Sequence, residues 1–493
     1  MVLHRLRSTP ATDLDLDAIR AELEVPGGFP ADVLAAADEA ARRRPEPDHD
    51  ATDLDLVTID PPGSRDLDQA VAVAERPGGG WRVHYAIADV AAWVVPDGAL
   101  DREARARTQT YYAPDRRIPL HPPVLGEGAA SLLPDGPRPA VLWTIDVEPD
   151  GTTASVDLRR AIVRSRAQLT YAQVQADLDA GRAPAAVAAL PALGDALIAD
   201  ARRRGAIDLG LPEQVVTRAD DGTWDLTLRA DLAVERWNAQ VSLLTGRAAA
   251  HLMLDAGVGI LRTLPSPDPA QLPRLRHAAA NLGIAWPDDV DPGAVLASLD
   301  PARPRHAAFA DLAAELLRGA GYSLVTAPGV VAPPPDRAGP GPSASDAPTG
   351  PADPGHAGVG GPYAHVTAPL RRLVDRFGTE VCLAVAAGRE VPAWVLAALP
   401  ELPERMAEGD RRSRKLDRAV VDAAEALVLS TRVGQVFAAA VVETGEKFGT
   451  VVLDQPAVRG RCDTRHLPLG AEIHVRCTEA DVAARTVRFE RVS

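Results

Sequence analysis

The sequence predicts an α+β protein in which a large mixed domain is followed by a small β-barrel. Its 493 residues are enough for two to four domains. A hydrophobic fraction of 46% and a charged fraction of 25% are typical of globular chains. Residues 51–428 alternate strand-like and helix-like segments, whereas residues 429–493 contain only short β runs separated by turns.

The composition excludes several classes of protein. No apolar run is long enough to span a bilayer, and the N-terminus lacks the apolar core of a signal peptide. The cysteines Cys382, Cys462 and Cys477 lie far apart, which excludes a CxxC zinc motif and a disulfide framework. We therefore expect a cytoplasmic protein with no membrane partner.

The net charge of −15 does not by itself indicate a nucleic-acid partner, although carboxylates at a metal site would contribute to it. The charge is also unevenly distributed. Residues 1–56 carry 13 Asp and Glu against 6 Lys and Arg, whereas residues 430–493 are nearly neutral. A polyanion would avoid the first segment and tolerate the last.

Local patterns predict the elements of the first half in order. Residues 1–50 form a short helical segment, because residues 14–44 contain two helix-like stretches, the second with Pro30 near its start and arginines at its end. The elements predicted next are a strand at 57–60, strands at 70–75 and 81–94 paired across a glycine turn, a helix at 100–112, strands at 140–149 and 153–166, and a helix capped by Thr170.

Longer helices are predicted in the second half. Residues 235–264 are apolar on more than one side, which predicts a buried helix broken near Gly257 and Gly259. Further helices are expected over 369–388 and 410–433.

Two segments near the C-terminal end have a distinct composition. Residues 329–361 are rich in Pro, Gly, Ala and Ser and contain no aromatic residue, so we expect a flexible insertion within the large domain. From Val433 onward, five short β runs in about sixty residues fit a barrel of the OB type.

Three aspartates, Asp60, Asp66 and Asp68, lie within nine residues of a loop that contains two prolines and a glycine. Carboxylates so close repel each other unless water or a cation screens them. One interpretation is a solvated acidic loop. The other is a magnesium or manganese site, since these ions prefer oxygen ligands and two of them can clamp a phosphodiester during in-line attack by water.

A second motif, YAHVTAPLRR, covers residues 363–372 and ends in Arg371 and Arg372. Paired arginines after a proline are either the solvated start of a helix or a grip for phosphate oxygens. His365 is a lone histidine beside a threonine, a setting more typical of a packing residue than of a catalyst. No Ser/His/Asp or Cys/His pairing is evident.

The two motifs together resemble the signatures of the ribonuclease II / ribonuclease R catalytic-domain family, a TID…DxDDA loop and a YxHxTSPIRR segment. Their order agrees, and similar segments between them extend the resemblance over about residues 50–425; these are 86–108, 111–134 and 202–213. The resemblance implies an RNB-type catalytic domain, in which a mixed sheet is surrounded by helices around a central RNA channel. It also implies that 429–493 is an OB-fold RNA-binding domain.

The resemblance implies a metal site in the acidic loop. Asp60, Asp66 and Asp68 match the first three aspartates of the family loop, which bind magnesium and position the scissile phosphate, and Asp68 matches the one on which catalysis most depends. The fourth position is Gln69, whose amide gives a divalent cation less charge than a carboxylate would. We therefore expect Asp60, Asp66, Asp68 and Gln69 to hold magnesium, with manganese as the alternative.

The resemblance also assigns RNA contacts. Arg371 matches the arginine that contacts the phosphate near the cut, and Arg372 either supports it or binds the next phosphate. Tyr112 and Tyr171 match tyrosines of the RNA path, although packing against the core is an alternative for each.

Departures from the family pattern identify a divergent bacterial member. Residues Leu209, Gln240 and Ala368 stand where the family usually has Phe, Glu and Ser. Residues 1–50 are too short, too helical and too acidic for the cold-shock domains that usually precede the catalytic domain.

Two functions remain open. The first is a metal-dependent exoribonuclease that hydrolyses single-stranded RNA in the 3′-to-5′ direction to nucleoside 5′-monophosphates, with Asp68 and Arg371 as catalytic residues. The second is an RNA-binding protein of the same fold that has lost efficient cleavage, an alternative motivated by Gln69 and Gln240. The family resemblance implies a monomer.

Overall fold

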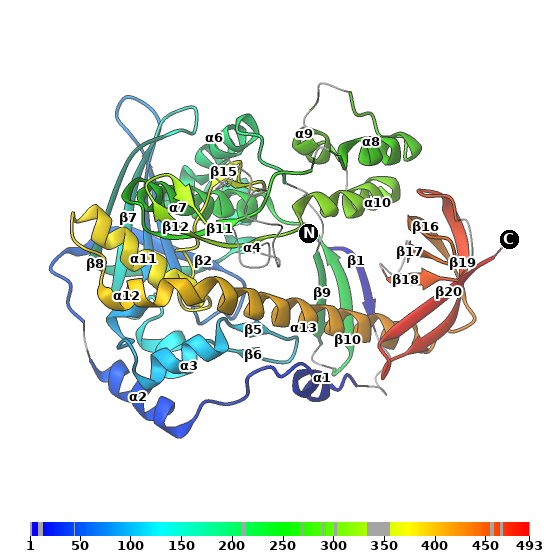
Figure 1. Cartoon of the computed structure of the whole chain (residues 1–493), viewed down its shortest axis with the longest axis horizontal. Coiled ribbons are helices and arrows are strands. Elements are labelled where there is room, and N and C mark those ends of the chain that lie inside the picture. Colours follow the sequence, from blue (N-terminus) through cyan, green and yellow to red (C-terminus); the bar gives the residue numbers. More distant parts are fainter. Residues whose placement is uncertain are drawn as a thin grey trace, which may run out of the picture.

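A single long helix, α13 (Leu402–Ser430), extends from a large body that contains one β-barrel to a second, smaller barrel at the other end of the molecule (Figure 1). No helix within the described part of the chain combines the length and the apolar character that crossing a membrane requires. The structure is a computed structural model that describes residues 2–7, 13–43, 45–208, 213–219, 221–268, 270–287, 290, 292–299, 303–332, 355–453, 458–463 and 467–492.

The larger barrel is a closed sheet with the strand order β2-β3-β4-β7-β8. Its strands are β2 (Asp50–Asp60), β3 (Gln69–Glu75), β4 (Trp81–Ala88), β7 (Arg138–Val147) and β8 (Thr153–Thr170). Alternate residues of β4 belong to two different buried clusters. Tyr85 and Ile87 belong to one cluster, and Ala86 and Ala88 belong to the other, so both faces of the sheet are covered. The expected mixed sheet is confirmed, and it closes because β2 pairs in parallel with β8.

The register of this closure places the acidic loop. Asp60 at the end of β2 pairs with Thr170 at the end of β8, and β3 begins at Gln69. The loop 61–68 therefore lies at the same end of the barrel as the start of α4 (Tyr171–Asp179), where Thr170 and Gln173 form a capping box. Local capping chemistry thus brings Tyr171 to the rim that carries the aspartates.

Helices surround the barrel and position the second motif. α7 (Ala233–Ala256) packs against α6 (Leu190–Arg203) and α11 (Leu373–Ala386). The segment that precedes α11 crosses α7 at Gly246, where an added Cβ would lie 2.2 Å from the Tyr363 ring. Only glycine allows this approach, so the crossing of these two segments depends on it.

The smaller barrel confirms the expected OB-type domain. Its strand order is β16-β17-β18-β20-β19, and it is closed. The five strands are β16 (Val436–Thr444), β17 (Gly449–Leu453), β18 (Arg459–Cys462), β19 (Glu472–Asp481) and β20 (Thr486–Val492). The apolar face of α13 packs on its core through Leu416, Val420 and Leu427.

The remaining elements are shorter. The helices are α1 (Leu16–Glu22), α2 (Ala31–Arg42), α3 (Ala99–Arg107), α5 (Ala185–Ala188), α8 (Leu272–Asn281), α9 (Pro292–Ala297), α10 (Pro304–Ala313) and α12 (Ala393–Ala398). The strands are β1 (Val2–Arg7), β5 (Tyr111–Tyr112), β6 (Arg117–Ile118), β9 (Glu213–Arg218), β10 (Trp224–Arg229), β11 (Gly259–Thr263), β12 (Gly321–Ala327), β13 (Val330–Val331), β14 (Gly355–His356) and β15 (Gly361–Pro362).

Several local predictions are wrong in part. The strand predicted at 81–94 ends at Ala88, and the helix predicted at 100–112 ends at Arg107, before the strand β5 (Tyr111–Tyr112). The N-terminal segment 1–50 is not only helical, because β1 pairs antiparallel with β10, more than 200 residues away. The buried helix predicted over 235–264 is confirmed as far as Ala256, and the expected break falls at Gly257, which adopts a left-handed φ of 72° as the C-cap. The apolar residues after the break form β11, which pairs with β12, and do not continue the helix. For β1 and β11 tertiary pairing decides the structure, and no local pattern reports it.

The predicted insertion 329–361 lies mostly outside the described residues. At its two described ends, β13 pairs with β12 and β14 pairs with β15. Its expected flexibility stays a prediction.

Glu425 of α13 links the two halves of the molecule. Its Oε1 accepts hydrogen bonds from the backbone N–H of Arg459 at 3.0 Å and from Nε2 of Gln214 at 3.1 Å. Burial raises the pKa of this carboxyl to about 7, and the nearby charge of Asp422 adds to the rise, while the two hydrogen bonds and Arg418 oppose it. The charged form is therefore disfavoured in the folded chain.

We expect Glu425→Gln to remove a pH-dependent loss of stability. The folded pKa lies above the unfolded one, so the contribution of Glu425 is fully present below the unfolded pKa and is lost as pH rises to about 7. Denaturant unfolding at several pH values should show the wild type losing about 2–3 kcal/mol relative to the variant between acidic and neutral pH. A difference that stays constant with pH would contradict this assignment.

Candidate active site

Asp68 and Arg371 meet at the rim of the larger barrel, although 303 positions separate them. The Asp68 carboxylate is buried; its Oδ1 accepts the backbone N–H of Leu370 at 2.7 Å and its Oδ2 accepts Nε of Arg371 at 3.2 Å. The Arg371 side chain is 44% exposed, whereas that of Asp68 is 5% exposed. The Arg371 side chain of this pair is therefore partly open to solvent, whereas the Asp68 carboxylate that it contacts is buried.

The segment that carries Arg371 is held by its own hydrogen bonds. Asp375, fully buried, accepts the backbone N–H of Ala368 at 2.6 Å and both Nε and Nη2 of Arg372, at 2.9 and 2.8 Å. Arg372 is thereby committed to a neighbour on its own segment, a geometry that favours the supporting role over contact with a second phosphate. As an RNA contact, Arg372 stays a prediction.

Asp66 faces a short hairpin formed by β5 and β6. It forms an ion pair with Arg117, which also pairs with Glu127 at 3.5 Å, and its Oδ2 lies 3.4 Å from the Tyr112 hydroxyl that donates to it. Tyr112 and Arg117 are cross-strand partners. Tyr112 is 46% exposed, so its ring lies beside the aspartates and is not packed in the core.

Asp60 has no hydrogen bond or ion pair from its side chain within the described residues. Burial raises its pKa to about 7; the Arg371 charge opposes this rise and the Asp66 charge adds to it. Burial likewise raises the pKa of Asp68 to about 7, against the opposing effects of Arg371 and of the Leu370 N–H. Burial thus disfavours the charged form of both carboxylates, and Arg371 offsets this effect only in part.

The aspartates do not converge on one point. Asp66 is turned toward Arg117 and Asp68 toward Arg371, and among the described residues no three His, Cys, Asp or Glu side chains form a group that could hold a metal ion. The chemistry of Asp60 and Asp68 nevertheless fits a divalent cation: both are oxygen donors, and both lack sufficient compensating charge. A metal held by Asp60, Asp66, Asp68 and Gln69 stays a prediction, and the hydrogen bonds of the Gln69 amide argue against Gln69 as one of the ligands.

Gln69 is engaged at both ends of its amide. Its Nε2 donates to the Thr367 carbonyl at 2.6 Å, and its Oε1 accepts the Tyr85 hydroxyl at 2.8 Å. Ser242 of α7 lies 3.3 Å from the same hydroxyl and donates to Thr367 Oγ1 at 3.0 Å. This network ties the acidic loop to the second motif, a connection that a neutral amide can make and a carboxylate cannot.

Two other predicted residues can be placed at the site. Tyr171 is half-buried against the main core; burial raises its pKa, and the charges of Asp60 and Arg371 also act on it, which places its hydroxyl near the site. His365 is partly buried with Nδ1 2.8 Å from the Tyr322 hydroxyl, as expected for a packing histidine. Leu209 lies outside the described residues.

Several residues that build this site were not predicted. Arg117 and Asp375 neutralise Asp66 and Arg372, and Tyr85 completes the Gln69 network. Arg117 lies only five positions after Tyr112, so a hairpin prediction there would have found it. Nothing in the sequence indicates Tyr85, because its role depends on closure of the barrel.

Comparisons with known proteins identify both parts of the chain. The model of the RNB domain matches residues 48–378, and that of the RNase II-type exonuclease C-terminal S1 domain matches residues 435–492. Ribonuclease R of Escherichia coli K12 is 42% identical over 125 residues, which are 25% of this chain and 15% of that protein. Ribonuclease R of Thermotoga maritima is 25% identical over 470 residues, 90% of this chain and 62% of that protein. The matches thus span less than two thirds of these relatives.

Solved structures share the fold. Mycoplasma genitalium RNase R in complex with ribose-methylated single-stranded RNA has a TM-score of 0.82 at 19% identity, covering 97% of this chain and 78% of that one. Yeast Ssd1, described as a pseudonuclease, has a TM-score of 0.67 at 15% identity, covering 94% and 56%. Because the RNB match covers more than half of the chain and the S1 match follows it in order, the chain belongs to the RNB-domain family of ribonuclease II and ribonuclease R.

Proposed function

We propose that the chain is an exoribonuclease that hydrolyses single-stranded RNA in the 3′-to-5′ direction and releases nucleoside 5′-monophosphates. The observation that carries this proposal is the contact between Asp68 and Arg371 at the rim that also holds Asp60, Asp66 and Tyr112. The polarity and the product are proposed from the resemblance to the ribonuclease II / ribonuclease R family.

Each residue has a defined task in this proposal. The exposed guanidinium of Arg371 binds an oxygen of the scissile phosphate and stabilises the charge that develops on it. Asp60 and Asp68, once deprotonated, would hold magnesium or manganese, and such an ion would supply an activated water and neutralise charge. The exposed ring of Tyr112 provides a surface on which a base near the 3′ end can stack.

A second function, RNA binding without efficient cleavage, is favoured by one feature. The fourth position of the acidic loop is Gln69, a neutral amide already engaged by Tyr85 and Thr367. The fold also occurs in yeast Ssd1, which is described as a pseudonuclease.

A time course on labelled RNA separates the two functions. Single-stranded RNA labelled at its 5′ end is incubated with magnesium, with manganese or with a chelator. The proposed enzyme produces a descending ladder and a short end product with metal, and releases the label at once as a mononucleotide from RNA labelled at its 3′ end. A gel shift without shortening under every condition would establish the binding protein instead.

The cellular setting is also a proposal. We propose a monomer that acts in the cytoplasm. Sedimentation of the purified chain tests the first part, and fractionation of cells tests the second.

We expect Gln69→Asp to lower stability without improving metal binding. The shorter carboxylate cannot donate to the Thr367 carbonyl and leaves that acceptor and the Tyr85 hydroxyl poorly paired. Loss of a buried hydrogen bond costs about 1–3 kcal/mol, measured as a lower thermal or denaturant midpoint. Gln69→Asn is the matched control, since the asparagine side chain has the length of aspartate and carries no charge. A stable Gln69→Asp chain that needs less magnesium for activity would instead make position 69 a metal ligand.

A further inference from the structure

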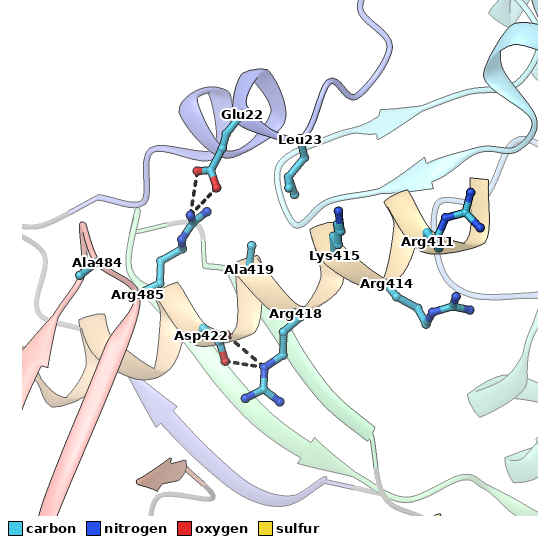
Figure 2. A pocket seen from close by; sticks show the side chains of 10 residues that line it. All are labelled: Glu22, Leu23, Arg411, Arg414, Lys415, Arg418, Ala419, Asp422, Ala484 and Arg485. Atoms are coloured by element: carbon cyan, nitrogen blue, oxygen red, sulfur yellow. Dashed lines mark hydrogen bonds and ion pairs between the residues drawn. The ribbon is translucent and has the colours of Figure 1, made fainter. Parts of the chain in front are cut away.

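The middle of α13 carries an exposed cationic surface. Arg411, Arg414, Lys415 and Arg418 recur at spacings of three and four residues, which places them on neighbouring sides of the helix, and all four are exposed. They line an open pocket of about 550 Å³ (Figure 2) together with the end of α1 and the turn between β19 and β20. We call this pocket the α13 basic groove; its other residues are Glu22, Leu23, Ala419, Asp422, Ala484 and Arg485.

The charges in the α13 basic groove do not balance. Five cationic side chains and two carboxylates line it, in a chain whose net charge is −15. Glu22 accepts hydrogen bonds from Arg485 at 2.7 Å, and Asp422 pairs with Arg418 at 2.8 Å. Within the described residues, neither an ion pair nor a hydrogen bond involves the side chains of the remaining three cations, Arg411, Arg414 and Lys415.

Folding does not account for these three cations. Elsewhere on α13 the arginines pair with carboxylates one turn away, as Arg405 does with Glu401 and Arg412 with Glu408. Like charges at that spacing destabilise a helix, so uncompensated cations at 411, 414 and 415 oppose its formation slightly. Their concentration on one open pocket is instead suited to a ligand with repeated negative charges, and arginine forks match phosphate oxygens.

The α13 basic groove lies next to the candidate active site. Arg412, within the same stretch of helix, donates to the Tyr111 hydroxyl at 3.1 Å, and the adjacent Tyr112 contacts Asp66. α1, which forms the opposite wall, is joined to the β5–β6 turn because Arg20 donates to Asp115 at 2.8 and 2.9 Å. The groove therefore lies between the smaller barrel and the hairpin that carries Tyr112.

We propose that the α13 basic groove binds the phosphate backbone of single-stranded RNA upstream of the 3′ end held at Arg371. This inference rests on the proposed function, since it takes RNA as the ligand. In this arrangement the strand passes from the smaller barrel along α13 to the β5–β6 hairpin. The groove makes no contact with bases, so it contributes affinity and not sequence preference.

The test is equilibrium binding of the full chain to a fluorescent single-stranded RNA of about 20 nucleotides, measured at several salt concentrations with a chelator present. The chelator stops turnover, so the readout does not depend on whether the chain cleaves. In the Arg411→Gln, Arg414→Gln, Lys415→Gln triple variant, affinity is expected to fall about tenfold or more, and the slope of log affinity against log salt is expected to decrease by about 2. The loss is expected to be smaller for an RNA of only a few nucleotides, which ends before the groove.

A matched control removes the same charge elsewhere. Arg159→Gln, Arg182→Gln and Arg389→Gln neutralise three exposed arginines outside the groove, and this triple variant should bind RNA nearly as the wild type does. Glu22→Gln provides a change in the opposite direction, because it removes a carboxylate from the wall of the groove and releases Arg485; it should bind RNA more tightly. Thermal melting confirms that each variant is folded.

The outcomes separate this inference from the proposed function. If the groove variant binds long RNA with wild-type affinity and wild-type salt dependence, the proposal that the groove binds RNA is wrong, even if the wild type cleaves RNA. The groove would then serve another anionic partner such as an acidic protein segment. A wild type that binds RNA through the groove but never shortens it with magnesium or manganese overturns the proposed cleavage and leaves the groove intact.

Discussion

Asp68→Asn is expected to reduce RNA cleavage on the order of 10³-fold while the chain stays folded and still binds RNA. The asparagine oxygen can still accept the Leu370 N–H, so the loop keeps the hydrogen bond that holds it against the second motif. What is lost is the negative charge opposite Arg371, and with it one carboxylate of the proposed cation site. Single-turnover cleavage rates, together with RNA affinity in the presence of a chelator, measure both effects.

The control for this variant is Asp53→Asn, the same chemical change at an exposed position of β2. It should cleave RNA at close to the wild-type rate. If Asp68→Asn cleaves at the rate of Asp53→Asn, the carboxylate of Asp68 has no part in the reaction, and the mechanism proposed for this site fails.

Arg371→Lys should lower kcat/KM by about 10²–10³-fold even though it retains a positive charge. The guanidinium of Arg371 uses Nε to hold Asp68, and the side chain is 44% exposed. A lysine has one ammonium group, so it can hold the carboxylate or contact a phosphate oxygen but cannot do both in the same geometry. Steady-state kinetics on a short single-stranded RNA give the measurement.

Two comparisons make the Arg371 result specific. Arg372→Lys weakens a buried pair with Asp375, so its main effect should be a lower melting temperature, with a smaller loss of kcat/KM in the folded protein. The Asp68→Asn, Arg371→Lys double variant should be little worse than the more impaired single variant, because both changes disrupt one contact. If the fold-losses in kcat/KM of the two single variants multiply in the double variant, the two residues act separately.

The sequence alone predicted the elements whose signals are local. The capping box at Thr170 starts α4, a glycine turn joins β3 to β4, and five spaced β runs form the smaller barrel. Each of these depends on side chains within a few residues of one another, so periodicity and turn chemistry report them. The family motifs likewise located both halves of the candidate site, the acidic loop and the arginine of the second motif.

Only the tertiary structure decided how these parts meet. Parallel pairing of β2 with β8 closes the barrel and brings Asp60 to the rim, and the Asp68–Arg371 contact joins the two motifs. The same pairing effects made Gly259–Thr263 a strand instead of the end of a helix. The physical reason is that the free energy of such contacts depends on burial and on partners hundreds of residues away. The sequence of an apolar or acidic segment therefore shows that it can form a long-range contact, and the fold determines which residues it contacts.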